Sequence, residues 1–385
     1  MYAGLSDLFN DLFGTNFRFS FPPTFGFLVA ISFLLAAWTL SMELKRRKEK
    51  GIFMPTLRKT TIGLPATPSE IGWNAVFGFI VAFKIVFIIL NKDEFFKDPP
   101  SVLLSLKGNF LAGLAGAALF GYLKYREMEK QKLPSPKVIE ENVYPHQMVS
   151  EFTMAAGIGG LIGAKIFHVL EYWSDFVQDP FGLLFSGSGL TMYGGLIVGG
   201  AAVLWYGRKH GVSPLQLCDS TAPGLMLAYG TGRLGCQLAG DGDWGIENVL
   251  PKPGWMNFLP DWFWSFRYPH NVNDIGVPIP GCTANHCMQL PVGVFPTPLY
   301  ESIACIALFF VLWAIRKKFS TPGKLFSVYL ILNGIERFLI ESIRVNSKYH
   351  VAGIDFTQAQ LISVLLVITG LTGLLLLKNR KKSLS

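Results

Sequence analysis

The sequence is poor in charged residues. Only 16% of its 385 residues are Asp, Glu, Lys or Arg, whereas 50% are hydrophobic, and soluble domains carry about 25% charged residues. Several apolar stretches approach the roughly 20 residues that a helix needs to span a bilayer. The strict alternation of an outer-membrane barrel is also missing. This composition argues against a soluble α/β protein and predicts an all-α, polytopic integral membrane protein.

The first apolar stretch, residues 25–40, lacks the basic segment and small-residue cleavage site of a signal peptide, so we expect it to remain as a helix. The whole chain contains about nine candidate spans of this kind. They cover residues 25–40, 73–90, 103–122, 152–170, 190–205, 215–234, 299–315, 325–343 and 361–377.

The basic residues are not spread evenly. The formal net charge is +8, and the basic clusters 45–48, 316–318 and 380–382 follow apolar stretches. This placement favours anionic lipid head groups as the partner and argues against nucleic acid. Basic stops follow the odd-numbered spans, so the positive-inside rule predicts the N-terminus outside and the C-terminus in the cytoplasm.

One glycine-rich stretch, residues 230–245, follows an apolar run and contains Arg233, Asp241 and Asp243. Charges at membrane depth are costly and usually face a cavity or a partner. The stretch therefore reads as a polar site at a bilayer boundary. The alternative is a helix end with a Gly-Asp turn, in which Arg233 extends to the interface.

A second charged group lies in the eighth predicted span. Arg337, Glu341 and Arg344 are spaced i, i+4 and i+7 and so share one helix face. A structural ion pair between Arg337 and Glu341 is one reading. Because the arginine fork suits phosphate oxygens, the other reading is an anionic head group held between Arg233 and Arg337.

Two further polar residues stand near predicted outer helix ends. Tyr193 stands before a Gly-Gly pair at the predicted outer end of its helix. One reading makes its hydroxyl a hydrogen-bond donor to an oxyanion, and the other makes it a tyrosine of the interfacial aromatic belt. Glu301 follows a Pro-Thr-Pro turn, where a helix N-terminus favours an acidic residue.

Cysteine is scarce, with five residues. Cys218 and Cys305 fall in apolar runs and read as packing residues. Cys282 and Cys287 lie in a polar outer loop, where a disulfide is favoured in an oxidising compartment. A zinc site would need four ligands, and only His270 and His286 are near. We expect no cofactor and no metal.

Four motifs together resemble the prolipoprotein diacylglyceryl transferase family. They are Tyr193-Gly-Gly, Gly232-Arg-Leu-Gly235 leading to Trp244-Gly245, Pro296-Thr-Pro-Leu-Tyr-Glu301 and Arg337-Phe-Leu-Ile-Glu-Ser-Ile-Arg344. The resemblance covers about residues 147–380 and the first span. Order, spacing and a shared outer-side placement make the match specific.

The resemblance implies that a diacylglyceryl group moves from phosphatidylglycerol to the thiol of the lipobox cysteine in a prolipoprotein signal peptide. A thioether forms and glycerol phosphate leaves, in the bacterial cytoplasmic membrane. The expected catalytic residues are Arg233, Arg337, Tyr193 and Glu341. The expected phosphatidylglycerol-binding residues are Arg233, Arg337, Gly194, Gly195, Gly235, Cys236, Asp241, Gly245 and Arg344.

The chain also departs from the family pattern. Tyr193 stands where a histidine is expected, and Cys236 where an asparagine is expected. The identity of the base that activates the thiol therefore stays open. Residues 60–145 look like an insertion that adds two spans, and residues 246–294 look like an enlarged outer loop. We expect both to belong to one transmembrane catalytic domain that covers residues 1–385.

Two other classes of function stay open. A transporter or lipid-binding scaffold would often show repeated halves with broken helices near the midplane, and the sequence shows no such repeat. A phospholipase would use water in place of the thiol and release free diacylglycerol.

Overall fold

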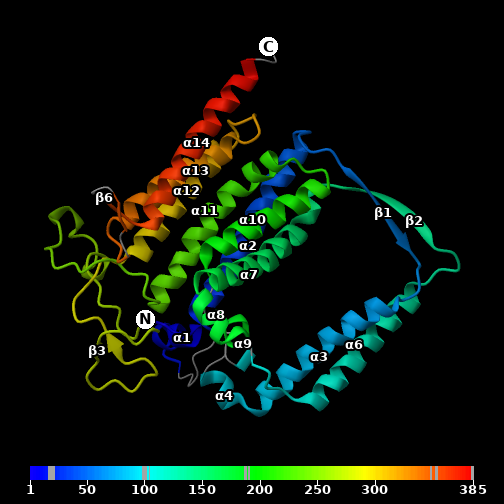
Figure 1. The fold of residues 1–385 in the computed structure, drawn as a ribbon, viewed down its shortest axis with the longest axis horizontal. Coiled ribbons are helices and arrows are strands. Elements are labelled where there is room, and N and C mark those ends of the chain that lie inside the picture. The colour runs from blue at the N-terminus through cyan, green and yellow to red at the C-terminus, as the bar shows by residue number, and fades with distance from the viewer. Residues whose placement is uncertain are drawn as a thin grey trace. The chain divides into compact units, whose positions relative to one another are not determined.

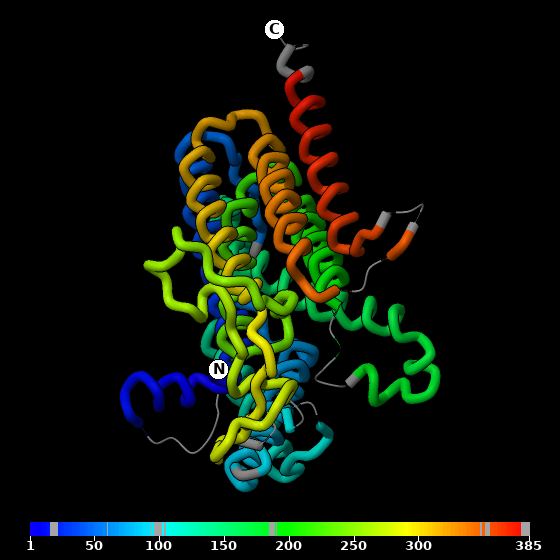
Figure 2. Tube along the Cα trace, turned by 90° about the vertical axis from the view of Figure 1, so that its left-hand side faces the viewer, coloured from blue at the N-terminus to red at the C-terminus, as the bar shows by residue number. Residues whose placement is uncertain are grey.

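The structure is a computed structural model that describes residues 1–15, 22–97, 102–103, 105–185, 189, 191–346, 349–351 and 354–382. These residues form two compact units, Met1–Lys50 with Val212–Ser385 and Gly51–Gly211. Long helices dominate both units, as Figures 1 and 2 show.

The first unit is a helix bundle with short peripheral elements. Its helices are α1 (Leu5–Phe13), α2 (Thr24–Glu49), α11 (Pro214–Ala239), α12 (Thr297–Ile315), α13 (Lys324–Glu341) and α14 (Gln358–Lys382). In Figure 1, α11, α12, α13 and α14 run side by side, and α2 packs on α11. The bundle interior includes Met226, Cys305, Phe309, Leu312 and Leu325.

The connection between α11 and α12 is long and mostly irregular. It contains η2 (Gly254–Met256), η3 (Asp261–Phe263), β3 (Val277–Pro278) and β4 (Met288–Gln289). Its core is the fully buried Tyr268, whose hydroxyl donates to Oε1 of Gln237 on α11 at 2.7 Å. This buried contact fixes the connection to the end of α11. A last hairpin, β5 (Tyr349–Val351) and β6 (Ile354–Phe356), precedes α14.

The second unit contains two helix pairs. One pair is α3 (Pro68–Leu90) with α6 (Phe110–Gln131), and the other is α7 (Val149–Glu171) with α10 (Met192–Lys209). The remaining elements are β1 (Thr56–Ile62), α4 (Lys92–Lys97), β2 (Lys137–Val143), η1 (Pro145–Met148), α8 (Trp173–Gln178) and α9 (Pro180–Phe185). Strands β1 and β2 pair antiparallel, Thr56 opposite Val143.

A long helix covers most of each predicted span. The predicted span 103–122 begins too early, because α6 starts at Phe110. Asn109 accepts from the amide of Ala112 and so caps the helix there. Leu190, the expected first residue of another span, lies outside the described residues. Five of the described helical segments are long and apolar enough to cross a membrane, as expected of a membrane protein. They are 24–49, 68–90, 145–171, 297–315 and 358–378. The predicted number of about nine spans is not confirmed and stays a prediction.

An ionic cluster closes one end of the first unit. Glu43 is fully buried, and its carboxylate contacts Arg46, Arg47 and Arg316. Nearby, Asp219 accepts hydrogen bonds from the amides of Gly323 and Phe326, both at 2.8 Å, and so caps the start of α13. Part of the basic charge that marks these helix ends in the sequence is therefore paired inside the bundle.

Cys282 and Cys287 form a disulfide in the long connection, as predicted. The bond consumes both thiols, so the alternative zinc site with these cysteines is contradicted. The imidazole of His286 contacts Asp274 at 3.0 Å instead.

Candidate active site

The candidate site lies at the opposite end of the first unit from Glu43. Helix α11 ends at Gly240, which takes the left-handed conformation with φ 67°, and glycine adopts it without strain. The chain then turns through Asp241 to Gly245. Thr297 Oγ1, at the start of α12, donates to the carbonyl of Asp243 at 2.9 Å, and Gly245 forms a β-bridge with Arg344 beyond α13.

Glu301 is the centre of the cluster and is fully buried. Its carboxylate pairs with Arg233 Nε at 2.8 Å, with Arg337 Nη1 at 2.8 Å and with Arg344 Nη1 at 3.7 Å. It also accepts a hydrogen bond from the hydroxyl of Tyr229. A buried carboxylate is tolerated when it is well paired, and here one carboxylate holds three guanidiniums together.

Asp243 joins the same arginines from the loop. One of its oxygens contacts Arg233 Nη1, and the other lies 2.6 Å from Arg344 Nη2. Burial pushes the pKa of the Asp243 carboxyl upward, but Arg233 and Arg344 outweigh it, so this pKa lies below its ordinary value. Asp243 is therefore an anionic partner of both arginines.

Glu341 supplies the third carboxylate. Its Oε2 lies 2.9 Å from Arg337 Nη2, so the predicted i,i+4 pairing is confirmed. Nδ2 of Asn346 donates to the other oxygen at 2.5 Å. Glu301 and Glu341 together hold the guanidinium plane of Arg337 at two of its nitrogens.

The cluster leaves polar groups unsatisfied. Nε and Nη1 of Arg344 are buried and have no hydrogen-bond partner among the described residues. Buried donors of this kind are costly unless a ligand or water satisfies them. One oxygen each of Glu301 and Glu341 is unsatisfied as well, so the cluster has both donors and acceptors open to a ligand. The planar forks of its arginines suit phosphate oxygens.

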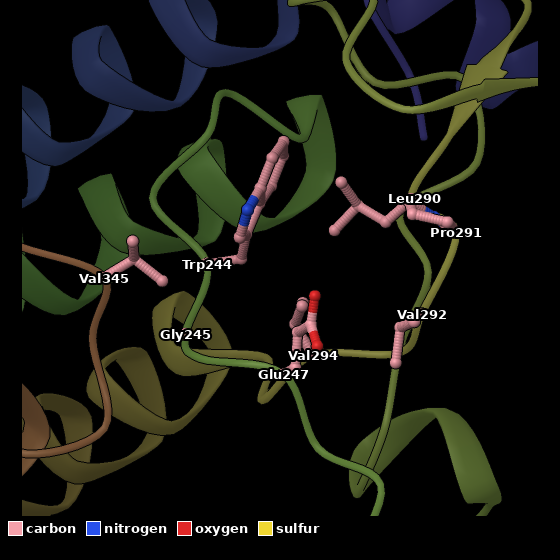
Figure 3. A pocket seen from close by; sticks show the side chains of 8 residues that line it. All are labelled: Trp244, Gly245, Glu247, Leu290, Pro291, Val292, Val294 and Val345. Carbon is pink, nitrogen blue, oxygen red and sulfur yellow. The ribbon is translucent and has the colours of Figure 1, made fainter.

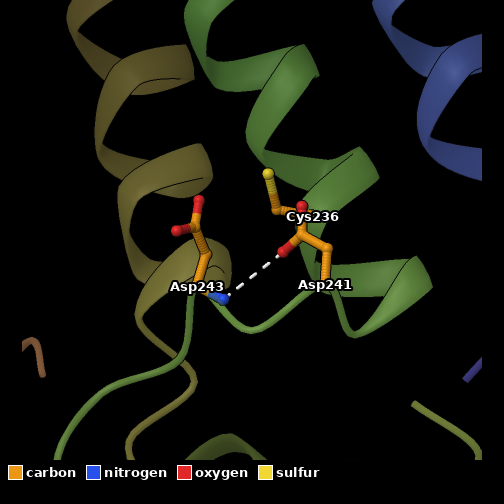
Figure 4. A group of neighbouring side chains, drawn as sticks. All are labelled: Cys236, Asp241 and Asp243. Carbon is orange, nitrogen blue, oxygen red and sulfur yellow. Dashed lines mark hydrogen bonds between the residues drawn. The ribbon is translucent and has the colours of Figure 1, made fainter. Parts of the chain in front are cut away.

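Cys236 and Asp241 lie close to Asp243, as Figure 4 shows. Ligand atoms of Cys236, Asp241 and Asp243 lie within 4.8 Å of one another, a spacing that could hold a metal ion. However, Arg233 Nη1 contacts both the Cys236 sulfur, at 3.7 Å, and Asp243. A guanidinium at this place repels a cation, so we assign no metal to the group.

Asp241 has a different role from Asp243. Its Oδ1 faces the amide of Asp243 at 3.4 Å, and no ion pair between Asp241 and an arginine is recorded among the described residues. Burial raises the pKa of the Asp241 carboxyl. Of the two aspartates in the glycine-rich stretch, Asp243 is the one that pairs with the arginines.

Tyr193, Gly194 and Gly195 belong to the second unit. A Cβ added at Gly194 would lie 2.4 Å from the carbonyl of Gly163, and one added at Gly195 would lie 3.1 Å from that of Gly160. The Gly-Gly pair thus allows α10 and α7 to approach closely.

The predicted binding glycines of the first unit also lie at close contacts. A Cβ on Gly235 would lie 3.2 Å from the ring of Phe25 on α2, and one on Gly245 would lie 2.6 Å from the carbonyl of Ile343. Gly245 therefore lets the loop after α11 pass directly against the segment after α13.

Sequence reasoning underestimated three residues. It read Glu301 only as a helix-terminus carboxylate, left Asp243 out of the binding set and did not single out Tyr229. A signal was present, because Glu301 falls in a family-like motif and on the same predicted side as the arginines. The pairing itself depends on α11, α12 and α13 meeting in space.

Comparison with known proteins shows the family to which the chain belongs. The sequence model of the family "Prolipoprotein diacylglyceryl transferase" matches residues 110–376, which is well over half of the chain. This match includes Arg233, Asp243, Glu301, Arg337, Glu341 and Arg344.

Individual relatives carry the same name. The phosphatidylglycerol–prolipoprotein diacylglyceryl transferase of Leptospira interrogans is 28% identical over 323 residues, which cover 70% of this chain and 88% of the relative. A second, from Clostridium perfringens, is 30% identical over 245 residues, covering 62% and 84%. The enzyme of Streptococcus uberis is 28% identical over 271 residues, covering 70% and 89%. This chain belongs to the prolipoprotein diacylglyceryl transferase family.

Proposed function

We propose that this chain transfers the diacylglyceryl group of phosphatidylglycerol to the lipobox cysteine of a prolipoprotein, in the bacterial cytoplasmic membrane. The bond between the diacylglyceryl carbon and the phosphate oxygen breaks, and a carbon–sulfur bond forms. Glycerol phosphate leaves with the electron pair of the broken bond, and the thiol proton passes to a base. The thiolate is the nucleophile, and it belongs to the substrate.

The arginine cluster is the observation that supports this proposal most strongly. Arg233, Arg337 and Arg344 come from three segments and meet around Glu301. Negative charge grows on the phosphate as the leaving group departs. Fixed cationic donors in a poorly hydrated site stabilise such charge without reorganisation. Arg233 and Arg337 hold the phosphate in this proposal, and Glu341 orients Arg337.

The three carboxylates organise the arginines in advance. The side chain of Asp243 is 34% exposed, whereas those of Glu301 and Glu341 are fully buried. Of the three carboxylates, Asp243 is therefore the one that is open to solvent. The buried carboxylates keep the forks in place while the phosphate of the lipid leaves as glycerol phosphate.

The remaining predicted roles belong to the same proposal. Tyr193 donates a hydrogen bond to the phosphate or handles the thiol proton, and Gly194, Gly195, Gly235, Cys236, Asp241, Gly245 and Arg344 border the bound lipid. The site faces outward, with the N-terminus outside and the C-terminus in the cytoplasm. Residues 60–145 add two helices to a single catalytic domain, and residues 246–294 form its outer loop.

The test is a transfer assay in detergent with phosphatidylglycerol labelled in its diacylglyceryl part and a lipobox peptide. We expect the label on the peptide with the wild-type chain and loss of about a hundredfold or more with Arg337→Ala, because a transition-state contact is worth about 2.7–4 kcal/mol. Arg316→Ala is the matched control, since it removes a paired arginine at the other end of the bundle.

The outcomes separate the alternatives. Labelled diacylglycerol released without peptide modification would indicate a phospholipase. Lipid binding without turnover would indicate a carrier or scaffold. Full transfer by folded Arg337→Ala would contradict the phosphate-binding role of that arginine.

A further inference from the structure

A small cavity is lined by residues that adjoin members of the arginine cluster in the sequence, and Figure 3 shows its lining. Three segments form its walls: the loop after α11, the segment before α12 and the segment after α13. The side chains that matter here are Trp244, Glu247, Leu290, Val292, Val294 and Val345. Two walls begin one residue beyond the cluster, because Trp244 follows Asp243 and Val345 follows Arg344.

The walls of this cavity are well supported. Glu247 forms a β-bridge with Val294, and Gly245 forms one with Arg344, so extended backbone frames it. Leu290 and Val294 are buried in the loop core, and Trp244 packs against that core. The ring of Trp244 lies 5.1 Å from the ring of Tyr268. The cavity is therefore built from segments that tertiary contacts fix.

Its size and chemistry restrict what it can hold. The volume is about 170 Å³, below the roughly 300–1,000 Å³ of sites that take a whole small molecule. The walls are largely aliphatic or aromatic, so they favour an apolar group of side-chain size. Glu247 adds an exposed carboxylate at the cavity, and its charge disfavours the phosphate of a lipid head group.

We propose that this cavity binds an aliphatic side chain of the acceptor polypeptide, close to its cysteine. This inference rests on the proposed transfer reaction, in which a thiol must reach the phosphate-binding arginines. An acyl chain of the donor lipid is far longer than the cavity. A side chain bound here contacts Trp244 and Val345, which follow Asp243 and Arg344 in the sequence. It thereby anchors the polypeptide so that the neighbouring cysteine reaches the lipid.

The test is steady-state transfer kinetics with both substrates varied. Val292→Trp fills the cavity, and we expect the peptide KM to rise roughly tenfold or more, as aliphatic pockets discriminate by such factors. The turnover number and the KM for phosphatidylglycerol should stay unchanged. Val249→Trp is the control, because Val249 is 77% exposed and does not line the cavity.

A second variant tests whether Val292→Trp acts through the cavity and not through misfolding. Val345 is 65% exposed, so Val345→Trp covers the cavity without disturbing the buried core, and the same rise in peptide KM is expected. A further set of peptides has each residue beside the cysteine replaced, one at a time, by glycine. At one position this replacement should raise the peptide KM of the wild-type chain but leave that of Val292→Trp unchanged.

The results that overturn the proposal are distinct. A raised KM for phosphatidylglycerol with an unchanged peptide KM would place the lipid in the cavity. Unchanged kinetics in both variants would leave the cavity without a substrate role. If the wild-type chain itself transfers no label to the peptide, the proposed reaction fails, and that result is separate from either of these.

Discussion

A carboxylate oxygen of Glu301 accepts a hydrogen bond from Nη1 of Arg337 at 2.8 Å, across 36 residues of sequence. This bond joins the start of α12 to the end of α13. Glu43 holds arginines in the same way at the other end of the bundle. The two buried carboxylates are thus chemically alike, but only the one at Glu301 lies within the proposed phosphate site.

Glu301→Gln should therefore reduce transfer strongly. Without the negative charge, three arginines lose their common partner and repel one another, and a fall of about a hundredfold corresponds to roughly 2.7 kcal/mol of transition-state stabilisation. Glu43→Gln is the matched control and should lower thermal stability while keeping activity per folded molecule. Equal loss of activity in both variants would show that Glu301 acts only through folding.

Arg233→Lys should also fail largely. Arg233 uses Nε toward Glu301 and Nη1 toward Asp243, and a lysine is a point charge that cannot reproduce this fork. Complementation of a strain depleted of its own transferase measures the effect, with the membrane level checked by blot. The control is Arg267→Lys, an exposed position in the long connection between α11 and α12. Normal growth on Arg233→Lys would argue that charge alone is sufficient.

Tyr193→Phe should lower transfer by about tenfold or more, because proton handling by a positioned side chain contributes at least this much. Tyr206→Phe is the control on the same helix, since Tyr206 packs against Phe152 and His210. Transfer rates of both variants would be compared at equal protein. A fully active Tyr193→Phe would leave the ring with a packing role.

Replacing both Cys282 and Cys287 by serine should leave measurable activity. The disulfide closes a short loop, and neither cysteine takes part in the recorded ion pairs of the arginine cluster. Mass shifts after alkylation, with and without reduction, would confirm the bond in the native protein. Complete loss of transfer in a folded double variant would tie this loop to catalysis.

Topology can be tested with single introduced cysteines. Ser320 and Asn257 are both exposed, and we expect them on opposite sides of the membrane. A membrane-impermeant thiol reagent should label Asn257→Cys in intact spheroplasts, but Ser320→Cys only after permeabilisation. Labelling of Ser320→Cys without permeabilisation would reverse the predicted orientation.

The sequence by itself determined the class of protein, and its resemblance to a known family predicted the reaction. Long apolar stretches are costly in water, so their number and length alone predict membrane helices. The i,i+4 pairing of Arg337 with Glu341 also followed from helix geometry, because both residues lie on one helix. The disulfide was predictable because its cysteines are near each other in the chain.

The tertiary structure decided which charges meet. Glu301 looked like an ordinary helix-start carboxylate, and its role follows only from the packing of α11, α12 and α13, which brings Arg233, Arg337 and Arg344 around it. Asp243 and not Asp241 pairs with the arginines, and this depends on the turn at Gly240. The spacing of residues in the sequence does not predict that turn. Ion pairs act over a few ångströms in space, and residues far apart in sequence reach that distance only once the helices have packed.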